Sequence, residues 1–285
     1  MEKTYPIKKE NRFRPKKRLG QHFIKDKQTI DEIIRKAGFS DSDTVLEIGP
    51  GLGALTIPLA GTVNQVLAVE KDSVLTRMLK ERLERAAVNN VVLFNGDILK
   101  LDFSEFLSPG LKRIKIIGNL PYNISSPFLE RLIKYRNIVS RAVLMFQSEF
   151  ARRLIASPGE KNHGALSILI QYQSRVFPLL EVSKEVFHPR PKIDSIVLGF
   201  DFREPYPRRA EDEDLFKIVV KGAFAHKRKT LYNSLRINFS SCMGGDILKA
   251  LGKCAIDPGK RAEALGIDDF LRLASSLKDP LTSAF

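Results

Sequence analysis

The first two thirds of the chain alternate between short apolar runs and amphipathic stretches. The runs are rich in β-branched residues, as is typical of buried strands, and they lie at Thr44–Ile48, Gln65–Val69, Val91–Phe94, Ile114–Ile117, Arg141–Phe146, Phe177–Val186 and Ser195–Phe202. Apolar positions three or four residues apart predict helices between them, near 26–37, 55–60, 73–86, 127–136, 148–156 and 163–175. This alternation predicts an α/β fold with a seven-stranded, mostly parallel sheet and helices on both faces. No helix separates the last two runs, so one of those strands is expected to be antiparallel.

Beyond residue 203 the pattern changes. Residues 204–209 are rich in proline and arginine and suit a linker, and residues 211–278 show helical periods without a clear strand. We therefore predict three parts: a flexible basic arm at 1–18, an α/β domain at 19–203 and a small all-helical domain at 204–285.

Polar residues and glycines follow four of the predicted strands. In a parallel sheet the carboxyl ends of the strands meet at one edge, where open α/β folds bind ligands. Glycines let the backbone approach a ligand closely, and the start of the following helix offers free N–H groups. A carboxylate after the second strand suits ribose hydroxyls, and one after the third can accept from an adenine amine. The residues concerned are Gly49 and Gly51, Glu70, Asp97 with the apolar Ile98, and Asn119.

The turn Asn119-Leu120-Pro121-Tyr122 is the most informative of these strand ends. Pro121 fixes its own φ and holds Leu120 extended, so the Leu120 carbonyl and the Asn119 side-chain carbonyl can both face outward. Tyr122 offers a flat face beside them. Two acceptors and one aromatic face suit a planar group with an exocyclic amine, such as adenine. By itself, the turn is equally typical of a strand end with a core tyrosine.

The glycine spacing alone leaves two classes of enzyme open. Gly49, Gly51 and Ala54 also fit the dinucleotide fingerprint, so a nicotinamide-dependent dehydrogenase is an alternative to a methyltransferase. The dehydrogenase leaves the Asn119–Tyr122 turn and the charge of the chain unexplained. S-adenosyl-L-methionine is the cofactor that fits both the row of strand ends and the turn.

The chain is strongly basic, with a formal net charge of +14. Such a balance favours a nucleic-acid partner. The basic residues gather in two clusters, which are expected to contact RNA, although the second could instead be a solvated helix face: Lys16, Lys17 and Arg18 near the N-terminus, and Lys227, Arg228 and Lys229 in the helical tail.

Other classes of protein receive no support. No apolar run approaches the roughly 20 residues that span a bilayer, and the N-terminus lacks the apolar region of a secretory signal. Cys242, Cys254 and the four histidines show no metal-ligand spacing. We expect a cytoplasmic protein without a metal, and nothing in the sequence suggests more than a monomer.

Three segments in order resemble the ribosomal RNA adenine N6,N6-dimethyltransferase family, and its small-subunit branch most closely. They are Leu19-Gly-Gln-His-Phe-Ile24, Gly118-Asn-Leu-Pro-Tyr-Asn-Ile-Ser126 and Phe187-His-Pro-Arg-Pro-Lys-Ile-Asp-Ser195, and the resemblance extends from about Leu19 to Ala274. It implies a Rossmann-like class I methyltransferase domain that uses S-adenosyl-L-methionine, followed by a helical RNA-binding domain. It further implies dimethylation of N6 on two adjacent adenosines near the 3′ end of small-subunit (16S) ribosomal RNA, in immature 30S-type subunits.

The resemblance also implies roles for individual residues. Gln21, His22 and Ile24 would close over the cofactor. Gly49 and Gly51 would approach its methionine part, Glu70 would hold the ribose, and Asp97 and Ile98 the adenine. Asn119 and Leu120 would accept from the target amine, while Tyr122 and Phe187 would stack the target adenine. In the tail, Ala223–Leu235 is similar to the family pattern, except that Lys227 and Tyr232 replace arginines.

Two neighbouring interpretations remain. One is the large-subunit branch of the family, against which the long helical tail and the Phe187–Ser195 segment argue. The other is a ribosome-assembly factor that has kept the fold without catalysis, against which the intact Asn119, Pro121 and Tyr122 argue. If the chain is an enzyme, its catalysis is expected to come mainly from positioning, because no histidine or carboxylate is placed as a general base.

Overall fold

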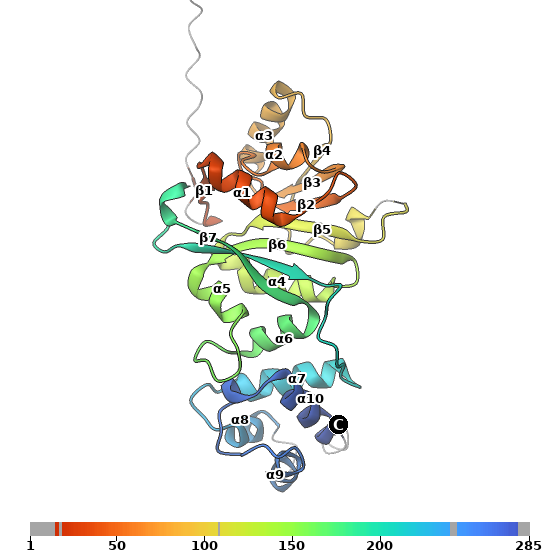
Figure 1. Cartoon of the computed structure of the whole chain (residues 1–285), viewed down its shortest axis with the longest axis vertical. Helices are drawn as coiled ribbons and strands as arrows, with labels where there is room; N and C mark the ends of the chain where they lie inside the picture. Colours follow the sequence, from red (N-terminus) through yellow and green to blue (C-terminus); the bar gives the residue numbers. More distant parts are fainter. Residues whose placement is uncertain (1–14, 17–18, 108, 240–243, 279–285) are drawn as a thin grey trace, which may run out of the picture.

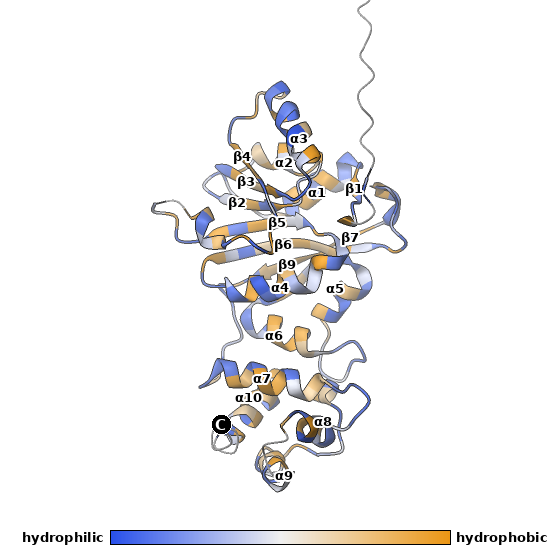
Figure 2. Ribbon diagram, turned by 180° about the vertical axis from the view of Figure 1, so that it is seen from behind, coloured by the Kyte–Doolittle hydropathy of each residue, from blue (hydrophilic) through white to orange (hydrophobic). Residues whose placement is uncertain are grey.

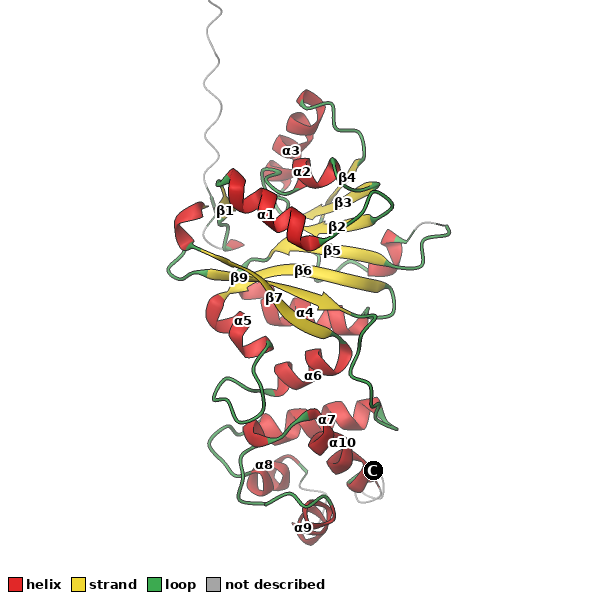
Figure 3. Cartoon of the chain, viewed as in Figure 1, coloured by secondary structure: helices red, strands yellow, loops and turns green. Residues whose placement is uncertain are grey.

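The computed structural model describes residues 15–16, 19–107, 109–239 and 244–278, so Lys17, Arg18, Cys242 and most of the predicted arm lie outside the described residues. The strands are β1 Phe23–Ile24, β2 Thr44–Ile48, β3 Gln65–Glu70, β4 Val91–Asn95, β5 Ile114–Asn119, β6 Val139–Gln147, β7 Arg175–Val182, β8 Phe187–His188 and β9 Ser195–Asp201. The helices are α1 Lys27–Ala37, α2 Thr56–Ala60, α3 Ser73–Arg85, α4 Ser125–Lys134, α5 Ser148–Leu154, α6 Ala165–Gln173, α7 Glu213–Phe224, α8 Leu231–Asn238, α9 Gly244–Lys253 and α10 Ile267–Ser276 (Figures 1 and 3).

Seven strands form one sheet, as predicted. Its order is β4-β3-β2-β5-β6-β9-β7. The strands from β4 to β6 pair in parallel, whereas β9 is antiparallel to both β6 and β7. The expected antiparallel strand is therefore β9. Because β2 lies between β3 and β5, the ends of these three strands are adjacent at the carboxyl edge of the sheet.

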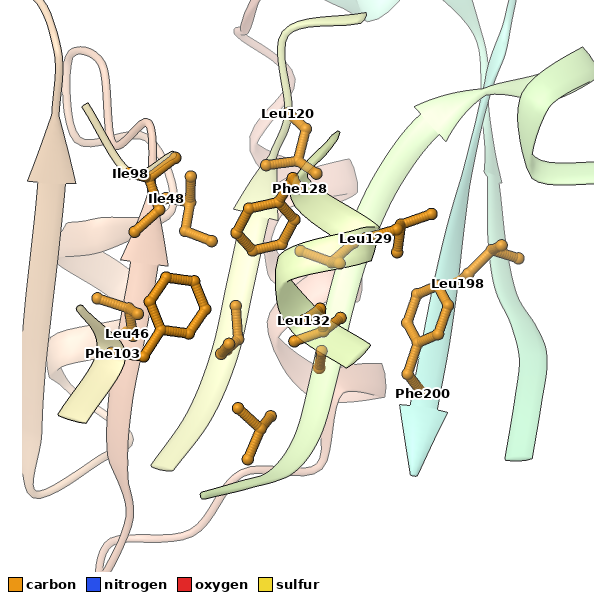
Figure 4. Packing of buried hydrophobic residues seen from close by; sticks show 14 of the residues in the cluster. Leu46, Ile48, Ile98, Phe103, Leu120, Phe128, Leu129, Leu132, Leu198 and Phe200 are labelled. Carbon is orange, nitrogen blue, oxygen red and sulfur yellow. The ribbon is translucent and has the colours of Figure 1, made fainter. Parts of the chain in front are cut away.

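The two faces of the sheet are covered by separate apolar layers, because alternate residues of a strand point to opposite faces. On one face Leu46 and Ile48 of β2 join a cluster with Phe103, Phe128 and Leu129 (Figure 4). On the other face Val45 packs in a cluster with residues of α1 and α2. In Figure 4, Ile48, Ile98 and Leu120 lie close together where the parallel strands end, so core side chains reach that edge of the sheet.

A second core lies in the helical tail (Figure 2). Its buried apolar residues come from α7 to α10, with Phe216, Leu235 and Phe270 among them, and also from Ile168 and Tyr172 of α6. The tail core thus extends into a helix that precedes residue 204. No helix in the described part of the chain is long and apolar enough to cross a membrane.

Some element boundaries differ from the predicted ones. The helix expected at 163–175 spans Ala165–Gln173, because Gly164 is its extended N-cap and Ser174 is extended as well. The strand expected at Phe177–Val186 is Arg175–Val182, and a 3₁₀ turn at Lys184–Val186 ends it early. Pro178 within that strand is tolerated because β7 is at the edge of the sheet.

The pair of strands β1 and β8 is absent from the predictions. These two-residue strands pair antiparallel, with Phe23 opposite His188 and Ile24 opposite Phe187. The amide of Lys25 also donates to the Val186 carbonyl, 2.9 Å away. Two residues are too few to produce a hydrophobic period, so the pattern of the sequence could not reveal this pairing.

Gly118 tests the contact between β2 and β5. A Cβ there would lie 3.0 Å from the Ile48 carbonyl oxygen and 3.2 Å from the Ile48 Cβ, neither of which can move without shifting β2. We expect Gly118→Ala to lower the free energy of unfolding by about 1–3 kcal/mol, measured by chemical denaturation. Gly252→Ala is the control, because a Cβ in that α9 position meets nothing within 4 Å. It should be neutral or stabilise by roughly 0.5–1 kcal/mol; equal effects of the two changes would contradict the packing described.

Candidate active site

A large cavity opens at the carboxyl edge of the sheet and has a volume of about 1390 Å³. This exceeds the roughly 300–1,000 Å³ of ordinary small-molecule sites, so it has room for more than one ligand. The predicted residues that line it are Gln21, His22, Ile24, Gly49, Gly51, Glu70, Asp97, Ile98, Asn119, Leu120, Pro121 and Tyr122. Lys16 and His188 line it as well. The fold therefore brings every predicted cofactor residue to one cavity.

The glycine loop after β2 has a backbone that only glycine adopts readily. Gly49, Gly51 and Gly53 have φ values of +67°, +58° and +86°. A Cβ on Gly51 would lie 2.8 Å from the Phe23 ring, so a side chain there would displace β1. The Gly51 amide donates to Glu70 Oε2, 3.1 Å away. The loop is thus shaped for close backbone approach to a ligand and is held against β3.

Glu70 is placed to bind hydroxyl groups. Its other oxygen, Oε1, accepts from the Asp72 amide at 2.8 Å. Each carboxylate oxygen can accept two hydrogen bonds, so each retains capacity for a ligand hydroxyl. Burial raises the pKa of Glu70, while the two backbone amides oppose the rise. These features fit the ribose part of an adenosyl cofactor.

Asp97 stands at the end of β4, beside the buried Ile98. Its Oδ2 accepts from Lys71 Nζ at 2.8 Å, and its Oδ1 from the Leu99 amide at 3.0 Å. Burial alone would raise the pKa of Asp97, but the hydrogen bonds from Lys71 and Leu99 outweigh it and hold the pKa below its ordinary value. Asp97 is therefore an ionised acceptor at neutral pH, next to an apolar side chain on which a ring can pack.

Asn119 is oriented by the N-terminal segment. Its Nδ2 donates to the His22 carbonyl at 2.8 Å. This contact leaves the Asn119 side-chain carbonyl as the acceptor at the end of β5. The next residues turn away from the strand, with Pro121 at φ −54° and ψ 133° and Tyr122 starting a 3₁₀ turn.

The His22 and Tyr122 rings are stacked, with their centroids 5.5 Å apart and their planes at 26°. His22 Nδ1 also lies 2.7 Å from the Pro189 carbonyl oxygen, next to β8. Burial raises the pKa of the Tyr122 hydroxyl, so the phenol is neutral. His22 therefore covers one face of the Tyr122 ring.

Phe187 does not line this cavity. Its side chain is 5% exposed and packs in the apolar layer formed by β1 and α1. The predicted stacking of the target adenine on Phe187 stays a prediction. The β1–β8 pairing sets Phe187 opposite the buried Ile24 and leaves its exposed neighbour His188 at the cavity.

Lys16 forms contacts that the sequence did not reveal, and its predicted contact with RNA stays a prediction. Its Nζ forms a 2.8 Å ion pair with Asp72 Oδ1, and its amide donates to Gln21 Oε1 at 2.8 Å. Gln21 Nε2 donates to Asp72 Oδ2 at 3.3 Å. Lys16 therefore fastens the N-terminal segment to the cavity wall. We name these three residues, Lys16, Gln21 and Asp72, the arm clasp.

Sequence reasoning missed Asp72, whose side chain is fully buried. Its Oδ1 also accepts from the Val74 amide at 3.1 Å and caps α3. The signal was present in the sequence, because an aspartate directly before a predicted helix is a typical N-cap. Although burial opposes ionisation, the bonds from Lys16, Val74 and Gln21 lower the pKa of Asp72 below 3.8.

Glu47 is a second missed acid, buried on the face of β2 opposite to Leu46 and Ile48. Its Oε2 has no hydrogen-bond partner among the described residues. Burial, with a smaller contribution from the charge of Glu70, raises the pKa of Glu47 to about 8. Glu47 is thus protonated at neutral pH and adds no charge to the cavity.

The other predicted residues lie elsewhere. Lys227, Arg228 and Lys229 follow α7 in the helical tail, and none of them lines the cavity. In Figure 1 the ends of α7 and α8 lie at the opposite end of the molecule from the glycine loop and α2. Within the described ranges, no group of three or more histidine, cysteine, aspartate or glutamate side chains could hold a metal ion.

Comparison with known proteins agrees with this site. Residues 12–279 match the family described as "Ribosomal RNA adenine dimethylase". A relative from Desulforapulum autotrophicum, named Ribosomal RNA small subunit methyltransferase A, is 42% identical over an alignment of 283 residues that covers 96% of each chain. A relative of the same name from Syntrophotalea carbinolica is 43% identical over 266 residues, covering 93% of this chain and 97% of the relative.

Two solved structures share most of the fold. A dimethyladenosine transferase from Plasmodium falciparum has a TM-score of 0.75 and 27% identity, covering 90% of this chain and 98% of its own. The 23S rRNA methyltransferase ErmE has a TM-score of 0.69 and 24% identity, covering 90% of this chain and 99% of its own.

The sheet order, the glycine loop and the acidic strand ends define a class I, S-adenosylmethionine-dependent methyltransferase. Within that class, the chain belongs to the ribosomal RNA adenine dimethylase family.

Lys16→Met tests the arm clasp. This substitution leaves the buried Asp72 without its cation. We therefore expect the free energy of unfolding at neutral pH to fall by about 1–2 kcal/mol. The loss is smaller than for a fully buried ion pair because Lys16 is partly exposed. The folded pKa of Asp72 lies below 3.8, so this difference is present above pH 3.8 and shrinks as the pH falls further. Lys36→Met is the control, because it breaks a surface ion pair with Glu32. It should lower the free energy of unfolding by about 0.5 kcal/mol or less. Equal losses for both variants would show that Asp72 does not need Lys16.

Glu47→Gln tests the buried acid. In the folded protein Glu47 keeps its proton up to a pKa of about 8, whereas the unfolded chain releases it near 4.5. Wild-type stability is therefore lost as pH rises between these two values, and the neutral glutamine removes that loss. We expect the variant to gain stability relative to wild type from pH 5 to 8, by on the order of a few kcal/mol. Denaturant titrations across this pH range give the free energy of unfolding of each protein. If it changed with pH equally in Glu47→Gln and in wild type, the raised pKa of Glu47 would be contradicted.

Proposed function

We propose that this protein transfers methyl groups from S-adenosyl-L-methionine to N6 of two adjacent adenosines near the 3′ end of small-subunit (16S) ribosomal RNA. The proposal depends most on one contact, the hydrogen bond from Asn119 Nδ2 to the His22 carbonyl. Because that bond engages Nδ2, the Asn119 side-chain carbonyl remains as an acceptor, and Asn119 lines the cavity together with Leu120 and Tyr122. Such an arrangement would recognise an amine on a flat ring, which is the chemistry of adenine N6.

The chain would act mainly by positioning the amine. The cofactor supplies an electrophilic methyl group. The Asn119 side-chain carbonyl and the Leu120 carbonyl would accept hydrogen bonds from the two N6 protons. These bonds would draw electron density onto the nitrogen, whose lone pair is otherwise delocalised into the purine ring. Pro121 holds the turn rigid, and Tyr122 would stack the base on the face that His22 leaves open. The methylated amine is acidic and can lose its proton to water, so no general base is required.

The small-subunit branch is favoured over the large-subunit branch. The relatives that are named for the small subunit are 42% and 43% identical to this chain, whereas the 23S rRNA methyltransferase ErmE is 24% identical. The intact Asn119-Leu120-Pro121-Tyr122 turn favours an enzyme over a purely structural assembly factor. Two transfers to one nitrogen require exchange of the spent cofactor, which suits a cavity larger than one ligand.

The proposal extends to partners and organisation. The substrate would be an immature 30S-type subunit, met in the cytoplasm by a monomer that contains no metal. The α/β domain at 19–203 would carry the chemistry, and the helical part at 204–285 would hold RNA through Lys227, Arg228 and Lys229. Lys17 and Arg18 would add contacts from the N-terminal arm, and so would Lys16, whose side chain is 37% exposed within the arm clasp.

Methyl transfer to unmethylated small-subunit particles tests the function directly. Radiolabelled S-adenosyl-L-methionine is the donor, and the product RNA is digested to nucleosides. We expect the label in N6,N6-dimethyladenosine. Monomethyladenosine alone would remove the second transfer from the proposal. Label in large-subunit RNA instead would support the other branch.

Asn119→Ala isolates the acceptor. We expect the rate of methyl transfer to fall by about 10²–10³-fold, the usual cost of losing one aligned polar group at a reacting centre. Asn64→Ala is the control, because Asn64 is an exposed amide between α2 and β3 and does not line the cavity. It should retain a nearly normal rate in single-turnover assays. A similar loss in both variants would mean that the loss does not come from the Asn119 carbonyl.

A further inference from the structure

A small basic site surrounds one buried histidine where the α/β domain meets the helical tail. His163 lies in the loop between α5 and α6 and is 5% exposed. Its Nδ1 is 3.0 Å from the Glu263 carbonyl oxygen, and its ring meets Phe224 edge-on at 6.1 Å. The loop is held to the same carbonyl by the Gly159 amide at 2.8 Å. His163 therefore sits where the loop, the end of α7 and the 3₁₀ turn Ala262–Ala264 meet.

The second ring nitrogen of His163, Nε2, is buried and has no hydrogen-bond partner in the part of the chain that the structure describes. Because a carbonyl can only accept, Nδ1 is the nitrogen that carries the proton. Nε2 is then a lone-pair acceptor, and it has no hydrogen-bond partner among the described residues. Burial lowers the pKa of His163 below 6.5, against opposing effects of Glu160 and Glu263, so the ring is neutral at physiological pH. A buried acceptor without a donor is costly unless something fills the position.

His163 lines a space of about 20 Å³, which is enough for one water-sized oxygen. Around this space stand four exposed cations, and none of them pairs with a carboxylate of the described chain: Lys161, Lys227, Lys229 and Arg261. His226 and Glu263 complete the lining. The site thus combines unpaired positive charge at the surface with a single acceptor beneath it.

We propose that this is a ribose-phosphate subsite, in which His163 Nε2 accepts from a 2′-hydroxyl of RNA while the surrounding cations hold the adjacent phosphates. The inference deepens the proposed function, since it names the group by which the helical tail distinguishes RNA. In RNA the 2′-hydroxyl is next to its own 3′-phosphate, so one nucleotide can meet both parts of the site. A phosphate alone would satisfy the lysines but offers the neutral Nε2 no proton. The 2′-hydroxyl is also the group that separates RNA from DNA.

Two matched probes test the subsite with the intact protein. One is an RNA hairpin without adenosine, which cannot be methylated, and the other is the same hairpin with every 2′-hydroxyl replaced by fluorine. Both keep A-form geometry, but only the first can donate to Nε2. We expect wild type to bind the RNA about five- to tenfold more tightly, as one hydrogen bond would give. Equal binding of the two probes by wild type would overturn the proposal.

Variants of His163 assign the preference to this residue. His163→Asn keeps an amide donor near Nδ1 and removes Nε2, so the preference should disappear. His163→Gln can place an acceptor near the position of Nε2 and should keep part of the preference for the 2′-hydroxyl probe. Lys227→Ala should weaken binding of both probes alike and reduce the salt dependence, because it removes only a charge. A preference that survives in His163→Asn would show that only water fills the space and that the histidine serves packing.

These results are independent of methyl transfer. A protein that shows the 2′-hydroxyl preference but methylates no adenosine would refute the proposed function and keep the subsite. A protein that dimethylates 16S RNA but binds both probes equally would support the proposed function and refute the subsite. Thermal unfolding of each variant identifies any change that comes from loss of the folded state.

Discussion

The contact between β2 and β5 is the constraint on which the site depends. Ile48 and Gly118 are partners in the parallel register, so the glycine loop and Asn119 leave the sheet side by side. The backbones can approach this closely only because residue 118 has no side chain. A one-residue slip would turn every side chain of β5 to the other face, and would separate the loop from the turn that faces it. The positions of the glycine loop and of Asn119 are thus set by one pair of strands.

The N-terminal segment completes what the sheet begins. Asn119 donates to the His22 carbonyl, and β1 pairs with β8, so three segments that are far apart in the sequence share one wall of the cavity. The arm clasp fixes the other end of the same segment on Asp72, which also caps α3. Each of these bonds joins a binding residue to an element of the fold, so the side chains are oriented before any ligand arrives.

Periodicity was sufficient to predict the sheet and the row of strand ends, because both depend on local pattern and on a general property of parallel sheets. Asp97 and Glu70 follow strands in the sequence and do so in the structure. The β1–β8 pair, the clasp on Asp72 and the burial of Phe187 depend on contacts between distant segments, and no window of sequence contains them. His163 shows the same limit, because its neighbours come from its own loop, from the end of a helix and from a turn whose Glu263 is 100 residues later in the chain.

The β1–β8 pairing also determines when in the life of the chain this site can exist. His22 and the Pro189 carbonyl are 167 residues apart in sequence, so the wall that they build closes one of the longest loops in the protein. On a ribosome the glycine loop and its strands emerge early, but the N-terminal wall has no partner until the segment around Pro189 has been made. A nascent chain shorter than this has no complete cavity. Competence for catalysis is therefore acquired late in synthesis.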